Sequence, residues 1–173
     1  MAIVFQYGSN CSEREMNSYD RLRGDARFVD IAETVEDYQL VFDVFSTKRG
    51  CAAADIRRTP GERVWGVLYD IPHHLMTRQA ARHFERRSFD AIEGEGTNYR
   101  REQIQVRKPG GEIVTALTYV VINPQPNLRT SAEYVGHIVA GLRDHGVPEE
   151  YIATVKRIAT ENNPDLHEAI SLL

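Results

Sequence analysis

The alternation of apolar and polar positions predicts a chain that forms strands over most of its length and helices toward its end. Short runs that are apolar or alternate with period two are bounded by turn residues, as is typical of strands. These runs are 2–6, 26–34, 38–45, 51–56, 64–71, 99–107 and 113–122. Pro109-Gly110-Gly111 predicts an antiparallel hairpin between the last two runs, and Thr59-Pro60-Gly61-Glu62 predicts a hairpin-like link between 51–56 and 64–71.

Helical signals are concentrated after residue 130, with two earlier segments. Ser, Pro and Gly at the ends of apolar-periodic stretches mark helix boundaries. The predicted helices are 12–20, 72–87, 131–145, 148–161 and a short one after Pro164, and 89–98 is predicted to be a loop. Strands followed by helices, joined by hairpins, favour an α+β fold in one domain over 1–173. The sheet is expected to be largely antiparallel, or a small barrel, with flanking helices.

Composition narrows the function classes. The chain has 173 residues, with 21 Lys and Arg against 25 Asp and Glu. This mildly acidic balance gives no overall field to recruit nucleic acid or an anionic membrane surface. The first ten residues lack the basic and apolar regions of a signal peptide, and Cys11 and Cys51 lack a C-x-x-C pattern. We therefore expect a cytoplasmic protein with reduced cysteines, no membrane span and no nucleic-acid partner.

The most informative local feature is Tyr7-Gly8-Ser9-Asn10, between the first apolar run and a predicted helix start. Glycine can adopt φ > 0, so the chain is expected to turn at Gly8 and aim backbone N–H groups into one concavity. Ser12 and Glu15 are spaced as a capping box, which would direct a helix N-terminus toward the same corner. The corner suits an anion, although an ordinary turn between strand and helix uses the same residue types.

A second feature is Glu93-Gly94-Glu95-Gly96, in the predicted loop before the strand at 99–107. A carboxylate held at the mouth of a pocket has a raised pKa and can act as a general base. The alternative is a solvated acidic turn, which local sequence leaves open.

Other candidates have competing explanations. Adjacent His73 and His74 diverge around a helix and have no zinc-helix spacing, so we expect no metal site there. Cys11 beside the corner is either a thiolate nucleophile or a small packing residue. The basic run either contacts phosphates or forms a solvated helix face, and it comprises Arg78, Arg82, Arg86 and Arg87.

In combination and in order, these motifs resemble the γ-glutamylcyclotransferase superfamily over residues 3–155. The matching segments are Tyr7-Gly8-Ser9-Asn10, an Ala-rich strand, Val64-Trp65-Gly66-Val67-Leu68-Tyr69, Glu95-Gly96, Tyr99-Arg100-Arg101, Tyr119 and Tyr134. The resemblance implies that the corner (Tyr7, Gly8, Ser9, Asn10) binds the γ-glutamyl end of a substrate. It also implies that Tyr119 and Tyr134 flank that substrate and that Glu95 is the catalytic residue.

Two departures from the family pattern are visible. Ala91-Ile92 stands where the family often has Leu-Asp a few residues before the glutamate, and Cys11 follows the asparagine in place of Met or Leu. The first change bears on how the catalytic loop is braced. Neither change removes a group that the chemistry needs.

The resemblance implies a cyclotransferase that converts a γ-glutamyl amine, amino acid or peptide to 5-oxoproline and the free amine. The expected partner is a small molecule, and no metal or other cofactor is expected because the substrate supplies its own nucleophile. A non-catalytic γ-glutamyl-binding module and a Cys11-dependent hydrolase are the alternatives. The sequence fixes neither the leaving amine nor the oligomeric state.

Overall fold

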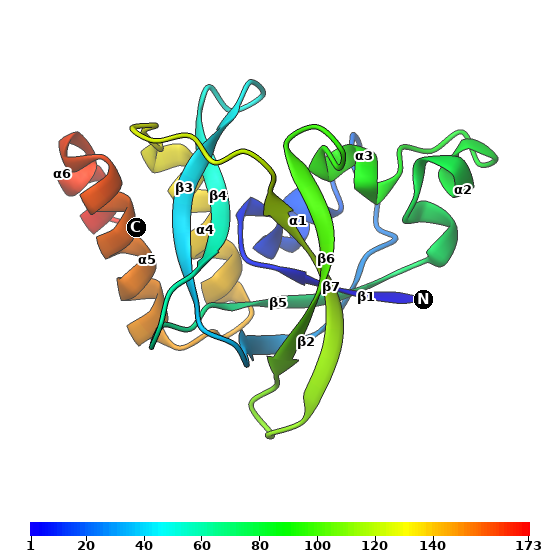
Figure 1. Ribbon diagram of the computed structural model, residues 1–173, viewed down its shortest axis with the longest axis horizontal. Helices are drawn as coiled ribbons and strands as arrows, with labels where there is room; N and C mark the ends of the chain where they lie inside the picture. Colours follow the sequence, from blue (N-terminus) through cyan, green and yellow to red (C-terminus); the bar gives the residue numbers. More distant parts are fainter.

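The computed structural model describes all 173 residues and is built around a closed five-stranded barrel. The strand order is β1 (Ala2–Gln6), β5 (Trp65–Ile71), β2 (Arg27–Thr34), β6 (Tyr99–Arg107) and β7 (Ile113–Val121). All neighbouring pairs are antiparallel except β1 and β7, whose parallel contact closes the barrel (Figure 1). The predicted α+β class with a small, largely antiparallel barrel is confirmed.

The remaining strands, β3 (Tyr38–Ser46) and β4 (Cys51–Arg58), form a separate two-stranded antiparallel sheet. The predicted pairing of 51–56 with 64–71 is therefore wrong: the turn at 59–62 connects two sheets. β5 pairs instead with β1 and β2, and Gly66 makes the first contact possible. A Cβ atom there would lie 2.3 Å from the Gln6 carbonyl oxygen, so a larger residue would separate β1 from β5.

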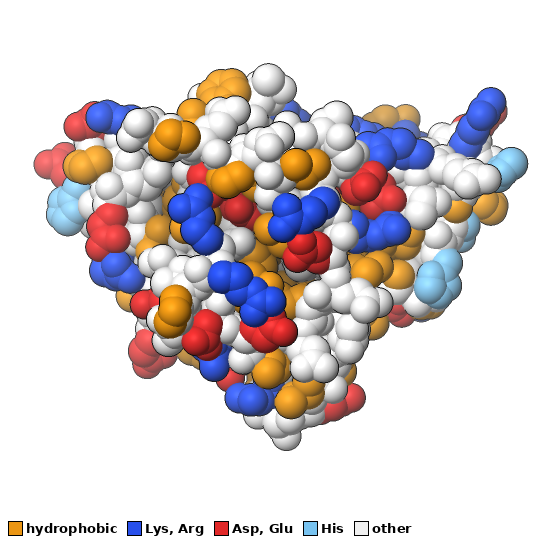
Figure 2. Space-filling model, in the orientation of Figure 1, with side chains coloured by type: hydrophobic (Ala, Val, Ile, Leu, Met, Phe, Trp, Pro, Cys, Tyr) orange, Lys and Arg blue, Asp and Glu red, His pale blue; other side chains and the backbone are white.

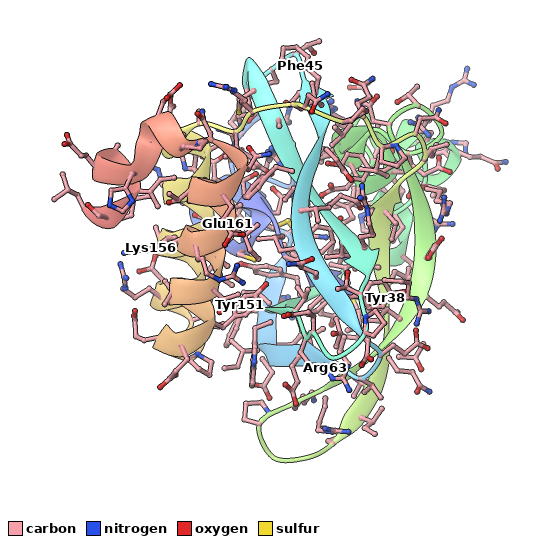
Figure 3. The ribbon with its side chains drawn as sticks, turned by 60° about the vertical axis from the view of Figure 1, so that its left-hand side comes forward. Tyr38, Phe45, Arg63, Tyr151, Lys156 and Glu161 are labelled. Carbon is pink, nitrogen blue, oxygen red and sulfur yellow. The ribbon has the colours of Figure 1, made fainter.

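The C-terminal helices are close to their predicted positions: α4 (Ala132–Asp144) and α5 (Glu149–Asn162), with a short α6 (His167–Ser171) after Pro164. α4 packs on α5 and on the short 3₁₀ helix η1 (Ser9–Cys11), and α5 packs on β3 (Figures 1 and 3). Gly141 lets α4 approach η1, because a Cβ atom there would lie 2.2 Å from the Ser12 nitrogen. None of the helices is long and apolar enough to cross a membrane.

Three earlier segments differ from their predictions. The helix expected at 12–20 is the single turn α1 (Glu13–Met16), although Ser12 caps it as its spacing predicts. The helix expected at 72–87 is broken into η2 (His73–Leu75) and α2 (Arg78–Arg82), because Thr77 caps a new start. Phe84, two residues after the end of α2, is 55% exposed. The loop expected at 89–98 contains a helix of its own, α3 (Phe89–Glu93).

Candidate active site

A small cavity of about 50 Å³ lies where β1, β4, α3 and α4 meet. All six predicted substrate-binding residues line it: Tyr7, Gly8, Ser9, Asn10, Tyr119 and Tyr134. The remaining lining residues are Gln6, Ala54, Glu93 and Tyr99. Residues 127 positions apart in sequence, from Tyr7 to Tyr134, thus surround one space whose walls offer mainly hydroxyl, amide and carboxyl groups.

The corner after β1 is a single turn of 3₁₀ helix, in which the Cys11 amide donates to the Gly8 carbonyl at 3.0 Å. Gly8 has φ −99°, so the expected positive φ is wrong. Glycine here avoids a tight contact with the cavity wall. A Cβ atom at Gly8 would lie 3.3 Å from the Tyr134 hydroxyl and 3.5 Å from the Ala54 Cβ, inside the wall of the cavity.

Glu93 is the carboxylate that faces this corner. It is the last residue of α3, whose first turn is capped by the Ser88 hydroxyl and whose end is set by Gly94 at φ +73°. This left-handed glycine ends the helix and lets the chain leave without moving the glutamate. The Asn10 side-chain amide donates to Glu93 Oε1, and Arg21 donates to the Asn10 Oδ1.

Burial sets the electrostatics of Glu93. Desolvation raises the pKa of its carboxyl group from 4.5 to about 7, while the Arg21 charge and the Asn10 hydrogen bond act in the opposite direction. A carboxyl group with a pKa near neutrality exchanges protons readily at physiological pH. Glu93 therefore has both the position and the acidity of an acid–base group.

Glu95, the predicted catalytic residue, lies outside the cavity. Its carboxylate accepts from Arg78 at 2.9 Å, its carbonyl accepts from the same guanidinium at 2.6 Å, and its side chain is 34% exposed. The assignment of the catalytic role to Glu95 does not fit this geometry, because Gly94 turns the chain away from the cavity before Glu95 is reached. Glu93 occupies the place that Glu95 was expected to fill.

One wall of the cavity is fixed by a chain of buried hydrogen bonds. The Tyr7 hydroxyl donates to the Tyr119 carbonyl, and the Tyr119 hydroxyl donates to Asp90 Oδ1 at 2.7 Å. Both Asp90 oxygens accept from Arg101, at 2.9 and 3.0 Å. Asp90 is in α3, three residues before Glu93, so this network holds the helix that presents the glutamate.

Tyr134 and Tyr99 also line the cavity, and both are hydrogen-bonded to the backbone of Ala54. The Ala54 amide donates to the Tyr134 oxygen at 3.0 Å, and the Tyr99 hydroxyl donates to the Ala54 carbonyl at 2.9 Å. Burial raises the pKa of Tyr134, although hydrogen bonds from Ala54 and Ser9 to its oxygen lower it in part. Tyr99 was not among the predicted binding residues, because a tyrosine at the start of a strand has no local signal that separates a pocket from a core position.

The other candidates do not join the site as nucleophile or ligand. Cys11 is fully buried, its thiol donates to the Gln6 carbonyl at 3.0 Å, and burial raises its pKa, so it is a packing residue rather than a thiolate. His73 and His74 are exposed in η2, away from the cavity. The structure contains no group of three or more His, Cys, Asp or Glu side chains placed to hold a metal ion.

Comparison with known proteins shows the family to which the chain belongs. Residues 63–155, more than half of the chain, match the model of the AIG2-like family. The chain belongs to the AIG2-like family. The match includes β5, α3, the strands β6 and β7, all of α4 and the first half of α5, and so contains Glu93, Tyr99, Tyr119 and Tyr134.

Individual relatives of the family extend the likeness over nearly the whole chain. The γ-glutamylcyclotransferase of Mus musculus is 26% identical over 161 residues, which cover 90% of this chain and 78% of that protein. A solved structure of a γ-glutamyl cyclotransferase has the same fold, with a TM-score of 0.74 at 22% identity, covering 90% of this chain and 86% of the other. An uncharacterized protein of Homo sapiens is as similar, with a TM-score of 0.73 at 25% identity and the same coverage. The predicted resemblance to the γ-glutamylcyclotransferase superfamily is confirmed.

Proposed function

We propose that the protein is a cyclotransferase that acts on γ-glutamyl amides, releasing 5-oxoproline and a free amine. The single observation that favours this most is the placement of Glu93. A partly buried carboxyl group with a pKa of about 7 faces a corner of backbone amides, in a chain of the AIG2-like family. The carboxyl group can carry the proton and the backbone amides can bind an oxyanion or carboxylate. A reaction that needs both functions would therefore suit this site.

The proposed chemistry uses the substrate's own nucleophile. The α-ammonium group of the γ-glutamyl unit gives one proton to Glu93, and the freed amine attacks the γ-carbonyl carbon to form a five-membered ring. Because this attack is intramolecular, its effective molarity is already large, and the protein mainly has to fold the substrate into the reactive geometry.

Collapse of the tetrahedral intermediate completes the reaction. Glu93 returns its proton to the departing nitrogen, the original amide C–N bond breaks, and the carbonyl forms again in the lactam. The second proton of the ring nitrogen passes to Glu93 and from there to the released amine. Glu93 thus acts first as base, then as acid, and ends the cycle ionised.

The six predicted binding residues have distinct proposed roles. The backbone amides of Gly8, Ser9 and Asn10 hold the α-carboxylate or the developing oxyanion. Tyr119 and Tyr134, which both line the cavity, orient the γ-glutamyl chain, and the Tyr7 hydroxyl fixes the Tyr119 backbone. A γ-glutamyl unit has both a carboxylate and an ammonium group, which this polar cavity can accommodate.

The test is an assay of purified protein with γ-glutamyl dipeptides, glutathione and γ-glutamyl amines, following 5-oxoproline and each amine by mass spectrometry. We expect wild type and Cys11→Ser to release 5-oxoproline in equal amounts and Glu93→Gln to release almost none. Release of glutamate in place of 5-oxoproline would indicate a hydrolase. Binding of γ-glutamyl compounds without any product would indicate the binding-module alternative.

A further inference from the structure

Arg21 differs from most basic side chains of this protein in having no carboxylate partner. On the face shown in Figure 2, basic and acidic side chains are interspersed over β3, β4 and β6. Arg21 is partly buried, no carboxylate lies within 4.0 Å of it, and its Nη1 group donates to the side-chain oxygen of Asn10. Partial burial of a guanidinium without an ion pair costs free energy, so its contact with Asn10 calls for an explanation.

The loop that carries Arg21 connects α1 to β2 and is closed by its own hydrogen bonds. The Asn17 side-chain amide donates to the Ala26 carbonyl at 2.9 Å, and its oxygen accepts from the Ala26 amide at 3.0 Å. Leu22 is fully buried, and its carbonyl accepts from Arg86 at 2.8 Å. The Arg21 side chain is therefore presented to Asn10 by a well-anchored backbone.

Asn10 connects Arg21 to Glu93. Its side-chain oxygen accepts from Arg21, and its side-chain NH2 group donates to Glu93 Oε1. A guanidinium has only donors and an ionised carboxylate has only acceptors, whereas an amide has one of each at its two ends. A turned amide would place its NH2 group against the donors of Arg21 and its oxygen against the carboxylate. The contact with Arg21 thus permits one orientation of Asn10.

This orientation determines which form of Glu93 is favoured. An NH2 group at Oε1 can only donate, and a donated hydrogen bond stabilises the ionised carboxylate. A turned Asn10 would instead offer its oxygen to the protonated acid and stabilise that form. Burial raises the pKa of Glu93 to about 7, and the charge of Arg21 and the hydrogen bond from Asn10 both oppose this rise.

We infer that Arg21 is a positioning residue, which fixes Asn10 with its NH2 group toward Glu93 and so keeps Glu93 ionised for its first step as a base. This inference rests on the proposed cyclotransferase function, in which Glu93 accepts a proton from the α-ammonium group of the substrate. Arg21 acts through Asn10 and does not have to touch the substrate.

The other ionisable groups around Glu93 do not share this role. Burial raises the pKa of four tyrosines that line the site, which therefore stay neutral: Tyr7, Tyr99, Tyr119 and Tyr134. An adjoining cavity of about 260 Å³ is lined by three further bases, none of which donates to Asn10 or Glu93: Lys48, Arg49 and Arg87. Asp55 in β4 and His137 in α4 line neither cavity, and Asp90 is paired with Arg101.

The experiment measures the ionisation of Glu93 in protein without substrate. Carbon-13 NMR follows the carboxyl signals against pH, and the signal missing from Glu93→Gln identifies Glu93. Arg21→Gln should raise the midpoint from its wild-type value by about one pH unit, because it removes a charge and lets the Asn10 amide turn. Arg21→Lys keeps a charge and has only donors, so its midpoint should stay within about 0.3 unit of wild type.

Further variants test whether the effect passes through Asn10. In an Asn10→Ala background, Arg21→Gln should raise the midpoint by less than about half of its effect in wild type, since the connecting amide is absent. Arg23→Gln is the matched control on the same loop: Arg23 is exposed and donates to the Tyr19 carbonyl, so its removal should not move the midpoint. Arg21→Met, a second neutral variant, should reproduce the rise seen in Arg21→Gln.

Three results of the titration would overturn the inference. These are an unchanged midpoint in both Arg21→Gln and Arg21→Met, an equal rise in Arg23→Gln, and an equal effect of Arg21→Gln with and without Asn10. The first would show that Arg21 does not affect Glu93, the second that any loop charge does, and the third that Asn10 does not transmit the effect.

Activity assays connect the ionisation of Glu93 to the reaction. The acid limb of kcat/KM reports the base of the free enzyme, so a shift of one unit predicts that Arg21→Gln is slower than wild type by about 9-fold at pH 6 and by less than about 1.5-fold at pH 8.5. An equal loss at both pH values would indicate a structural effect and overturn the inference. Failure of wild type to release 5-oxoproline from any γ-glutamyl substrate would overturn the proposed function, whereas the NMR titration would still decide whether Arg21 controls Glu93.

Discussion

Glu93 and Glu95 are the same residue type, two positions apart, each followed by a glycine, yet they occupy opposite environments. Glu93 ends a helix and faces a cavity beside Asn10, whereas Glu95 lies in the following turn and pairs with Arg78 at the surface. The difference comes from Gly94, whose left-handed conformation reverses the chain between them. Side-chain chemistry therefore does not decide which carboxylate can act as an acid–base group; the end of the helix does.

The largest expected effect is on turnover. Glu93→Gln keeps the shape of the side chain and removes its proton exchange, so we expect kcat/KM to fall by about 10³-fold or more. Glu95→Gln removes only an exposed ion pair and should stay within about 3-fold of wild type. Steady-state assays of 5-oxoproline release check both variants. If Glu95→Gln were inactive and Glu93→Gln active, the assignment of the acid–base role to the buried Glu93 would be wrong.

The next effect is the pH dependence of stability. Because burial raises the pKa of Glu93 to about 7 from 4.5, the folded protein retains a proton that the unfolded chain releases, and its stability falls as pH rises through this window. Glu93→Gln has no such ionisation and should be more stable than wild type at pH 8, by about 1 to 3 kcal/mol.

This gain should vanish below pH 4.5, where the wild-type carboxyl group is protonated in both states. Urea unfolding of wild type, Glu93→Gln and Glu95→Gln at pH 4 and pH 8 measures the difference. Glu95→Gln is the control, and we expect it to show no gain at pH 8. An equal gain in both variants would contradict a special environment at Glu93.

A smaller effect is expected at the two glycines. Gly94 and Gly96 have φ of +73° and +82°, so alanine at either position should cost about 1 kcal/mol of stability. Only Gly94→Ala disturbs the end of α3, and we expect it alone to lower kcat/KM, by about 10-fold. Thermal unfolding of the two variants measures the backbone strain that both substitutions cause. Their activities measure the displacement of the end of α3, which only Gly94→Ala causes. Equal activity losses would show that the whole turn matters rather than the helix end.

The smallest effect is expected from Arg78→Ala, which releases Glu95 from its ion pair. Exposed pairs contribute little, so the unfolding free energy should change by less than about 1 kcal/mol and kcat/KM should stay within about 2-fold. A large loss of activity would mean that the Arg78 contact holds the loop that presents Glu93. The surroundings of Glu95 would then affect those of Glu93, which we expect to be independent of them.

The strands and the last helices could be predicted from sequence because their signals are local. Alternating runs, Pro109-Gly110-Gly111 and the caps around α4 and α5 all lie within the elements that they specify. The pairing of β5 with β1 rather than β4 could not be predicted in this way. It depends on the close approach of Gly66 to Gln6, a contact between segments sixty residues apart.

In the site, too, some features have local sequence signals and others depend on contacts between distant segments. The corner and the two tyrosines were predicted from combined motifs, but α3 has only five residues and gives little periodic signal. Its capping residues were nevertheless present: Ser88 precedes it and Gly94 follows it. These two signals place Glu93 at a helix end and Glu95 beyond it. The partners that tune Glu93, Arg21 and Asn10, come from a distant segment and are visible only in three dimensions.

The parallel contact of Val4 with Leu117, which closes the barrel, also sets a limit on when the site can form during synthesis. Of the five barrel strands, β1 leaves the ribosome first, yet its second neighbour, β7, is made last. The Tyr134 hydroxyl that borders Gly8 emerges later still. The corner must therefore wait, with one strand edge unpaired, until β7 and α4 have been translated, and a nascent chain stalled before α4 would have no assembled site.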